Sequence, residues 1–117
     1  MVRMARPDLI HKAICSGNVQ WKDSAARNML GEERTKNFTL NGVKGWLCDY
    51  VLDKGAGCVR PRPETDEYWL TLTPDDPWWY KVNIELNDRP ARLFVNMKLV
   101  DPNDEDEPWA EIVGAHF

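Results

Sequence analysis

The chain has 117 residues, of which 43% are hydrophobic and 29% charged. This composition argues against a disordered chain and predicts one domain, residues 1–117, with a hydrophobic core of its own. The net charge of −4 gives no general reason to expect nucleic-acid binding. Basic residues nevertheless outnumber acidic ones in positions 1–62, so this half can present a basic surface in spite of the acidic total.

The cysteines give information about the cellular compartment. Cys15, Cys48 and Cys58 are odd in number and have no CxxC spacing. Without a signal sequence or a long apolar run, they predict reduced thiols in a cytoplasmic protein with no membrane segment. His11 and Cys15 stand four residues apart, as two metal ligands on a helix would. No second pair of ligands accompanies them, so we predict neither a metal site nor a cofactor.

Three helices are predicted in the first half of the chain, over residues 7–16, 24–30 and 40–54. Pro7 stands near the start of the first helix, and a short extended link, residues 19–21, leads towards the second. Thr39 or Asn41 opens the third helix and Gly55 ends it. Its apolar residues recur at spacings of three and four, which predicts that Trp46 faces the sheet with Leu47 and Tyr50.

Strand patterns dominate from about residue 58 onward. Residues 58–63 are extended, and two prolines confine them to a sheet edge. Residues 68–73 alternate as a strand, residues 78–86 and 92–99 form a β-hairpin around a turn at 87–90, and residues 112–117 form a final strand. Helices followed by strands predict an α+β fold, with the N-terminal helices packed on one face of an antiparallel β-meander.

The alternation also predicts the two faces of the hairpin. One face is apolar and should meet the core, whereas Lys81 and Lys98 share the opposite, polar face. Polar residues on a sheet face are most often simply solvated. Whether His116, in the last strand, shares this face depends on the strand order, which the sequence does not specify.

Candidate residues for chemistry are few. A metal-free ribonuclease needs a group that moves protons, cations that stabilise the phosphorane, and a flat surface that holds a base. His116 is the candidate acid or base, and a frayed terminal histidine is the alternative. Most of the six tryptophans should lie in the core. The other candidates are Lys81 and Lys98 as catalytic cations and Arg60, Arg62 and Trp79 as RNA-binding residues.

Three segments carry a resemblance to a known family. Residues 19–29, with Trp21, Ser24 and Arg27, look like a "W-x-x-[HS]-A-x-x-R-M" segment. Residues 93–99 and 112–116 are similar to an "L-[FY]-V-K-[LM]-K-L … I-[VI]-S-[AF]-H" ending. With the order of helices and strands, these segments resemble small ribonuclease toxins of the barnase–EndoU–colicin–RelE grouping, including RelE-like and MqsR-like toxins.

The resemblance implies an endoribonuclease with an RNA substrate and a protein antitoxin or inhibitor as partner. It carries over Arg27, as an RNA-binding residue, together with Lys98 and His116. Two positions depart from the pattern. Ser24 stands where many relatives have a histidine, and Asn96 stands where they have a lysine. The resemblance therefore also implies a second possibility, a descendant that has kept the scaffold and lost cleavage.

The alternative function is a non-catalytic module that binds another protein, of the immunity, phage or inhibitor type. The acidic residues between 101 and 107 and the six tryptophans favour it, because aromatic side chains dominate binding hot spots. The position of His116 in the fold separates the two hypotheses. A basic cleft that joins His116 to Lys81 or Lys98 favours the enzyme, and an exposed aromatic patch favours the binding module.

Overall fold

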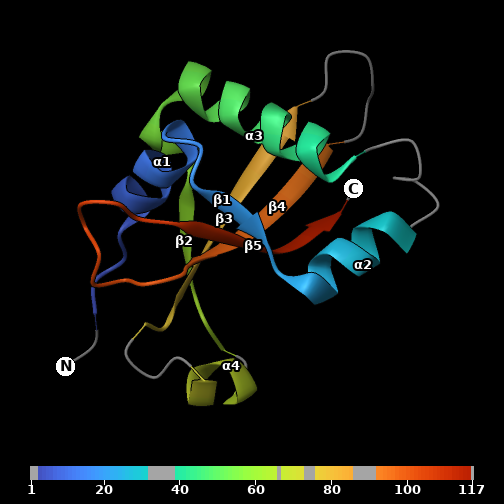
Figure 1. Ribbon diagram of the computed structural model, residues 1–117. Coiled ribbons are helices and arrows are strands. Elements are labelled where there is room, and N and C mark those ends of the chain that lie inside the picture. The colour runs from blue at the N-terminus through green and yellow to red at the C-terminus, as the bar shows by residue number, and fades with distance from the viewer. Residues whose placement is uncertain (1–2, 32–38, 66, 73–75, 86–91, 117) are drawn as a thin grey trace.

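The computed structural model describes residues 3–31, 39–65, 67–72, 76–85 and 92–116 (Figure 1). The predicted turn at 87–90 lies outside these residues. The order of elements agrees with the predicted α+β class, with helices first and strands dominating later. The elements are α1 (Pro7–Cys15), β1 (Val19–Trp21), α2 (Asp23–Gly31), α3 (Leu40–Lys54), η2 (Ala56–Cys58), β2 (Arg60–Pro63), α4 (Glu67–Leu72), β3 (Trp78–Glu85), β4 (Arg92–Leu99) and β5 (Ala110–His116).

The strands form one five-stranded sheet in the order β1-β5-β4-β3-β2. Strands β2 to β5 pair with their neighbours in antiparallel fashion, as predicted. The segment Val19–Trp21, predicted as a link, is instead a strand that pairs in parallel with β5. Three residues are too few to show an alternation in the sequence. What makes them a strand is the free edge of β5, where Ala110 N–H donates to Asn18 O at 3.0 Å.

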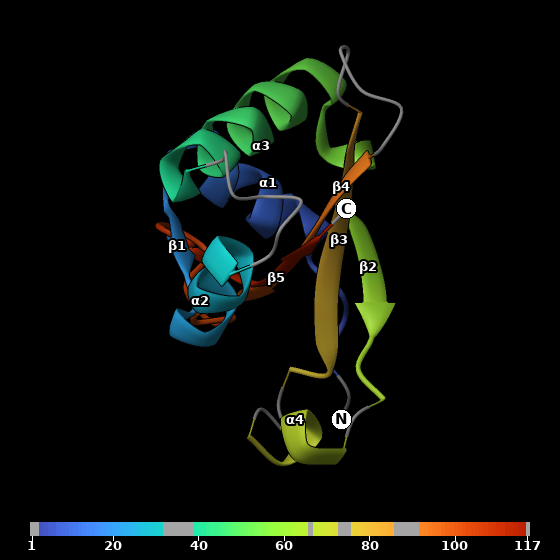
Figure 2. The same ribbon diagram turned by 90° about the vertical axis from the view of Figure 1, so that its right-hand side faces the viewer.

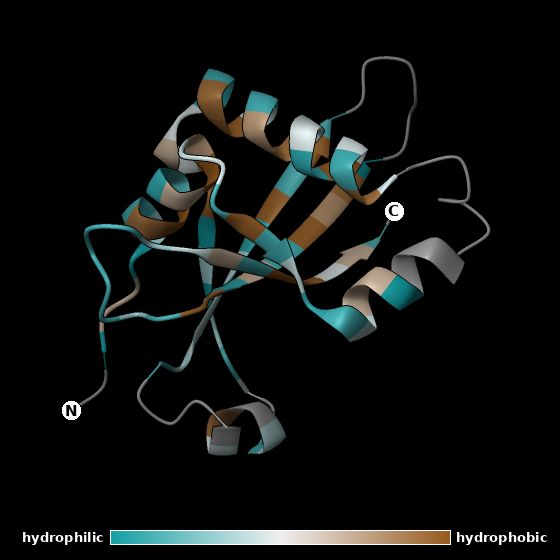
Figure 3. Ribbon diagram, viewed as in Figure 1, coloured by the Kyte–Doolittle hydropathy of each residue, from teal (hydrophilic) through white to brown (hydrophobic). Residues whose placement is uncertain are grey.

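The core lies between the sheet and helices α1 and α3, which Figure 2 shows on the same side. The predicted alternation of the hairpin is confirmed, since the core-facing residues of β3 and β4 are buried. Figure 3 shows hydrophobic segments where α1 and α3 face the strands. The buried residues include Leu9, Ile10, Ala13 and Ile14 of α1, Val43, Leu47 and Val51 of α3, Tyr80, Val82 and Ile84 of β3, and Leu93, Val95, Met97 and Leu99 of β4.

Local signals place the ends of α3. The Thr39 hydroxyl accepts from Gly42 N–H at 2.9 Å at the first turn, and Gly55, with φ of 79°, ends the helix. Trp46 and Tyr50 are half-buried at the margin of the core, whereas Leu47 is completely buried. Within the described segments, no helix combines the length and the apolar character needed to cross a membrane.

The prediction of a strand over residues 68–73 is wrong for residues 68–72, and residue 73 lies outside the described residues. Glu67–Leu72 form the short helix α4, in which the Thr71 hydroxyl donates to Glu67 O at 2.8 Å. The physical reason is the absence of a partner. Near its start, at Tyr80 and Lys81, β3 is already paired on both edges, with β2 and with β4, and β-forming side chains favour a strand only where a neighbouring strand packs against them. The segment therefore closes its hydrogen bonds locally as a helix beyond the end of the sheet (Figure 1).

The acidic segment after β4 folds against the N-terminal segment. Arg6 forms ion pairs with Asp8 and Glu105, and Lys12 Nζ donates to Glu105 O at 2.9 Å. These contacts neutralise part of the acidic charge. The segment joins the end of β4 to the start of β5, so it lies at the opposite end of β5 from His116.

Candidate functional site

The face of the sheet opposite the core collects the basic side chains of strands β2 to β5. We call it the open face, because its residues are half-buried or exposed, with Lys98 as the exception. The strand registers place these residues side by side although they come from four strands. The open face consists of Arg60, Arg62, Trp79, Lys81, Asn83, Glu85, Arg92, Phe94, Asn96, Lys98, Glu111 and His116.

Phe94 joins the histidine to a lysine on this face. The ring of His116 stacks on the ring of Phe94, with centroids 5.4 Å apart and planes 23° from parallel. Lys81 Nζ lies 4.7 Å from the centroid of the same ring, a cation–π contact. Phe94 is on β4, between Lys81 on β3 and His116 on β5. The strand order thus answers the question that the sequence left open, because His116 and Lys81 share a face.

Two arginines of β2 extend the basic surface beside Lys81. Arg60 is opposite Lys81 in the register and Arg62 is opposite Trp79, and both arginines are exposed. Neighbouring strands lie about 4.8 Å apart, so the width from β2 to β5 is roughly 15 Å. Phosphate groups along an extended nucleic-acid strand can therefore meet more than one of these cations.

Lys98 is on the open face but away from His116. It pairs with Glu111, whereas His116 pairs with Phe94, four residues back along β4, which corresponds to roughly 13 Å. The Lys98 side chain is also only 8% exposed. Its Nζ donates to Trp78 O at 3.1 Å and lies 4.0 Å from Glu64 Oε2. The Lys98 ammonium therefore makes contacts within the protein, where it stabilises the start of β3.

A buried carboxyl group lies near this ammonium. Asp76 is 4% exposed, and neither of its carboxylate oxygens has a hydrogen-bond partner among the described residues. Burial raises the pKa of Asp76, and the positive charges of Lys98 and Arg3 oppose this increase. A charge in such a position destabilises the fold unless it is paired.

We expect Asp76→Asn to raise the free energy of unfolding at pH 7 by about 1 kcal/mol, because it removes a buried charge and keeps the shape. The pKa of Asp76 is higher in the folded protein than its unfolded value of roughly 3.9. The buried charge therefore lowers the stability of the wild type at pH values above the folded pKa, and this cost disappears below the unfolded pKa. The advantage of the variant should therefore shrink from pH 7 to pH 4 in urea titrations. If the variant is less stable than the wild type at pH 7, the attraction between the Lys98 ammonium and the Asp76 carboxylate outweighs the cost of burying the carboxylate.

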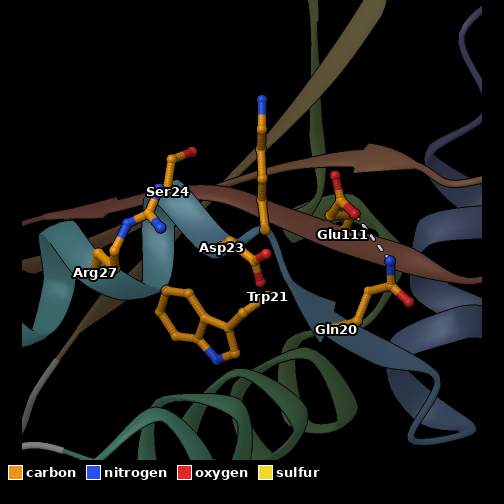
Figure 4. A pocket seen from close by; sticks show the side chains of 7 residues that line it. Gln20, Trp21, Asp23, Ser24, Arg27 and Glu111 are labelled. Atoms are coloured by element: carbon orange, nitrogen blue, oxygen red, sulfur yellow. Dashed lines mark hydrogen bonds between the residues drawn. The ribbon is translucent and has the colours of Figure 1, made fainter.

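Arg27 belongs to a different place, a shallow hollow of about 530 Å³ at the β1 edge. Figure 4 shows Arg27 and Ser24 on α2, with Trp21 directed towards α3. Gln20 Nε2 donates to Glu111 Oε2 at 2.8 Å along one wall. The lining carries both signs of charge, so Arg27 is not part of a purely basic surface. The hollow is lined by Gln20, Trp21, Lys22, Asp23, Ser24, Arg27 and Glu111.

Sequence reasoning did not single out Phe94. The signal was present, because the alternation of β4 puts Phe94 on the same face as Lys98 and therefore on the face of Lys81. It also did not single out Asn83, Glu85 and Arg92 as site residues. They line a small pocket of about 160 Å³ with Arg60, Tyr50 and Cys58. The pocket exists because β2 begins at Arg60, and the periodicity of the sequence alone does not show where β2 begins.

The three cysteines are free. Burial raises the pKa of the Cys48 and Cys58 thiols, while Cys15 is exposed with its Sγ 3.6 Å from His11 Nε2. In the described part of the chain, no group of three or more histidine, cysteine or acidic side chains is placed to hold a metal ion.

Comparison with known proteins does not add a relative. No protein-family model matches the chain, and neither the curated proteins nor the solved structures include a significant match.

Proposed function

We propose that the open face binds single-stranded RNA and cleaves it without a metal ion, as the small ribonuclease toxins that the sequence resembles do. The observation that supports the proposal best is the stack of Lys81, Phe94 and His116 on a face where cations predominate. It combines a proton-transfer group, a cation and an aromatic platform within one cluster. These are the parts that cleavage of a ribose phosphodiester requires.

In this mechanism the ribose 2′-oxygen attacks the phosphorus, and the bond to the 5′-oxygen breaks. One proton leaves the 2′-hydroxyl and another reaches the 5′-oxygen. His116 carries out one of these transfers, since histidine exchanges protons near neutral pH. Lys81, with Arg60 opposite, stabilises the charge that develops on the phosphorane. The products carry 2′,3′-cyclic phosphate and 5′-hydroxyl ends.

The remaining candidates have separate roles in this proposal. Arg62 and the half-buried Trp79, which are opposite each other, hold the strand next to the cluster. Lys98 stabilises the sheet rather than the phosphorane, because its ammonium is already bonded to Trp78 O and close to Glu64. A protein antitoxin that covers the open face would be the partner, in the cytoplasm, and the acidic segment near Glu105 would lie outside that contact.

A protein-binding module remains the second candidate, supported by a small exposed apolar patch. Val100 and Trp109 are 50% and 39% exposed and lie side by side, with Val100 N–H donating to Trp109 O at 3.0 Å. The other exposed large apolar residues come from separate parts of the described chain, namely Met4, Leu52 and Tyr68. Because these residues do not gather into a larger patch, the open face is the better candidate for the functional surface.

The test is incubation of the folded protein with single-stranded RNA in EDTA, followed by mapping of the ends. We expect 2′,3′-cyclic phosphate termini from the wild type. Lys81→Ala should reduce the rate roughly 10²–10³-fold, the usual effect of losing one stabilising group at a developing charge. The matched control is Lys44→Ala on α3, which lies on the core side of the sheet. If the folded wild type leaves the RNA intact, the cleavage hypothesis is wrong and the protein-binding module becomes the preferred function.

A further inference from the structure

The small pocket beside the Lys81–Phe94–His116 cluster has a clear structural origin. Strand β2 begins at Arg60, opposite Lys81, so the outer edge of β3 beyond Lys81 has no neighbouring strand among the described residues. Tyr50 of α3 and Cys58 of η2 border the resulting gap. The pocket, of about 160 Å³, therefore opens next to the proposed reaction centre.

Asn83 places an unsatisfied acceptor in the wall of this pocket. Its Oδ1 is buried and has no hydrogen-bond partner among the described residues, and Asn83 is opposite Phe94 in the register. Buried amide oxygens in native proteins are nearly always hydrogen-bonded, so an exception calls for an explanation. A ligand N–H in the pocket supplies the missing donor after a small rotation of the amide.

The charged groups of the pocket are two guanidinium groups and one carboxylate. Arg60 and Arg92 are the donors, and Glu85 is the acceptor, with Arg92 Nη2 3.4 Å from Glu85 Oε1. Guanine presents two adjacent acceptors, O6 and N7, which a guanidinium recognises bidentately. It also presents N–H groups at N1 and N2, which suit a carboxylate and an amide oxygen. Adenine offers its N6 amino group but has no O6, and the pyrimidines have no N7.

We propose that this pocket binds the guanine base of the nucleotide next to the cleaved phosphate. The proposal rests on the proposed function, which puts that phosphate over Lys81 and His116. Asn83 is opposite Phe94 and Arg60 is opposite Lys81, so a base in the pocket has its phosphate over the cluster. Glu85 and Asn83 accept from the base, Arg92 donates to it, and the ring of Tyr50 forms a wall.

The experiment measures binding of the four ribonucleoside 3′-monophosphates to the full chain by calorimetry, which does not depend on cleavage. Guanosine 3′-monophosphate should bind at least about 10-fold more tightly than the other three, within the 5- to 150-fold range of one bidentate base contact. Glu85→Gln should remove this preference, because the variant lacks the carboxylate that accepts from N1 and N2 of guanine. The matched control is Glu111→Gln, also on the open face but outside the pocket.

Asn83→Leu is the second variant. It removes the amide oxygen and keeps a side chain of similar size, so it should also lower the preference for guanosine 3′-monophosphate. Equal binding of all four nucleotides, or an unchanged preference in both variants, overturns the proposal. If RNA is cleaved without a preference for guanine, the guanine-binding proposal is wrong and the proposed ribonuclease activity stands. If guanosine 3′-monophosphate binds selectively but RNA is not cleaved in EDTA, the guanine-binding proposal stands and the proposed ribonuclease activity is wrong.

Discussion

His116→Ala should reduce RNA cleavage by 10²–10⁴-fold, the usual effect of removing a positioned acid–base group. The melting temperature should change little, because His116 is exposed at the end of β5, where its ring stacks on Phe94. The rates are measured with one RNA substrate in EDTA at several pH values. Added imidazole should restore part of the rate of the variant, since it supplies the missing proton-transfer group in the space left by the side chain.

The chain provides a control for this variant. It contains two histidines, and His11 lies on α1, on the other side of the sheet. His11→Ala should therefore cleave RNA at the wild-type rate. If His116→Ala cuts as fast as His11→Ala, His116 is only a residue at the end of a strand. The open face would then bind RNA or a protein without this chemistry.

Leu47→Ala should lower the free energy of unfolding by about 2–5 kcal/mol, the range for a completely buried leucine. Leu47 is 0% exposed in the middle of α3, where it packs against the sheet. The control is Leu52→Ala in the same helix, which removes the same atoms from a side chain that is 61% exposed. A urea titration of both variants separates the cost of the cavity from the change in helix propensity.

The same titration tests the orientation of α3. If Trp46 faced the sheet, as the sequence predicts, Trp46→Ala would cost on the order of 3–5 kcal/mol. Trp46 is only half-buried at the margin of the core, so its replacement should cost less than that of Leu47. A larger loss for Trp46 than for Leu47 would mean that α3 is rotated relative to the sheet.

The candidate site was predictable in part, and the difference between the two lysines shows why. The alternation put Lys81 and Lys98 on one face, and the structure agrees. Their surroundings differ, because Lys81 contacts Phe94 while Lys98 is bonded to Trp78 O, close to Glu64. These contacts join residues on separate segments, and a periodic pattern gives no information about such partners.

The sequence by itself determined the features that depend on near neighbours in the chain. Pro7, Thr39 and Gly55 mark the ends of helices through their own backbone preferences and hydrogen bonds. The period of two in β3 and β4 separates the core face from the open face, because successive side chains of a strand must point to opposite sides.

Only the tertiary structure decided the features that require a partner far along the chain. Val19–Trp21 became a strand because β5 offered a free edge, and Glu67–Leu72 became a helix beyond the end of the sheet, where no strand of the described chain pairs with it. His116 lies on the same face as Lys81 because β5 lies next to β4, and both side chains contact Phe94. Local propensity is a weak constraint where hydrogen-bond partners are distant, so the pairing of strands decides which side chains meet.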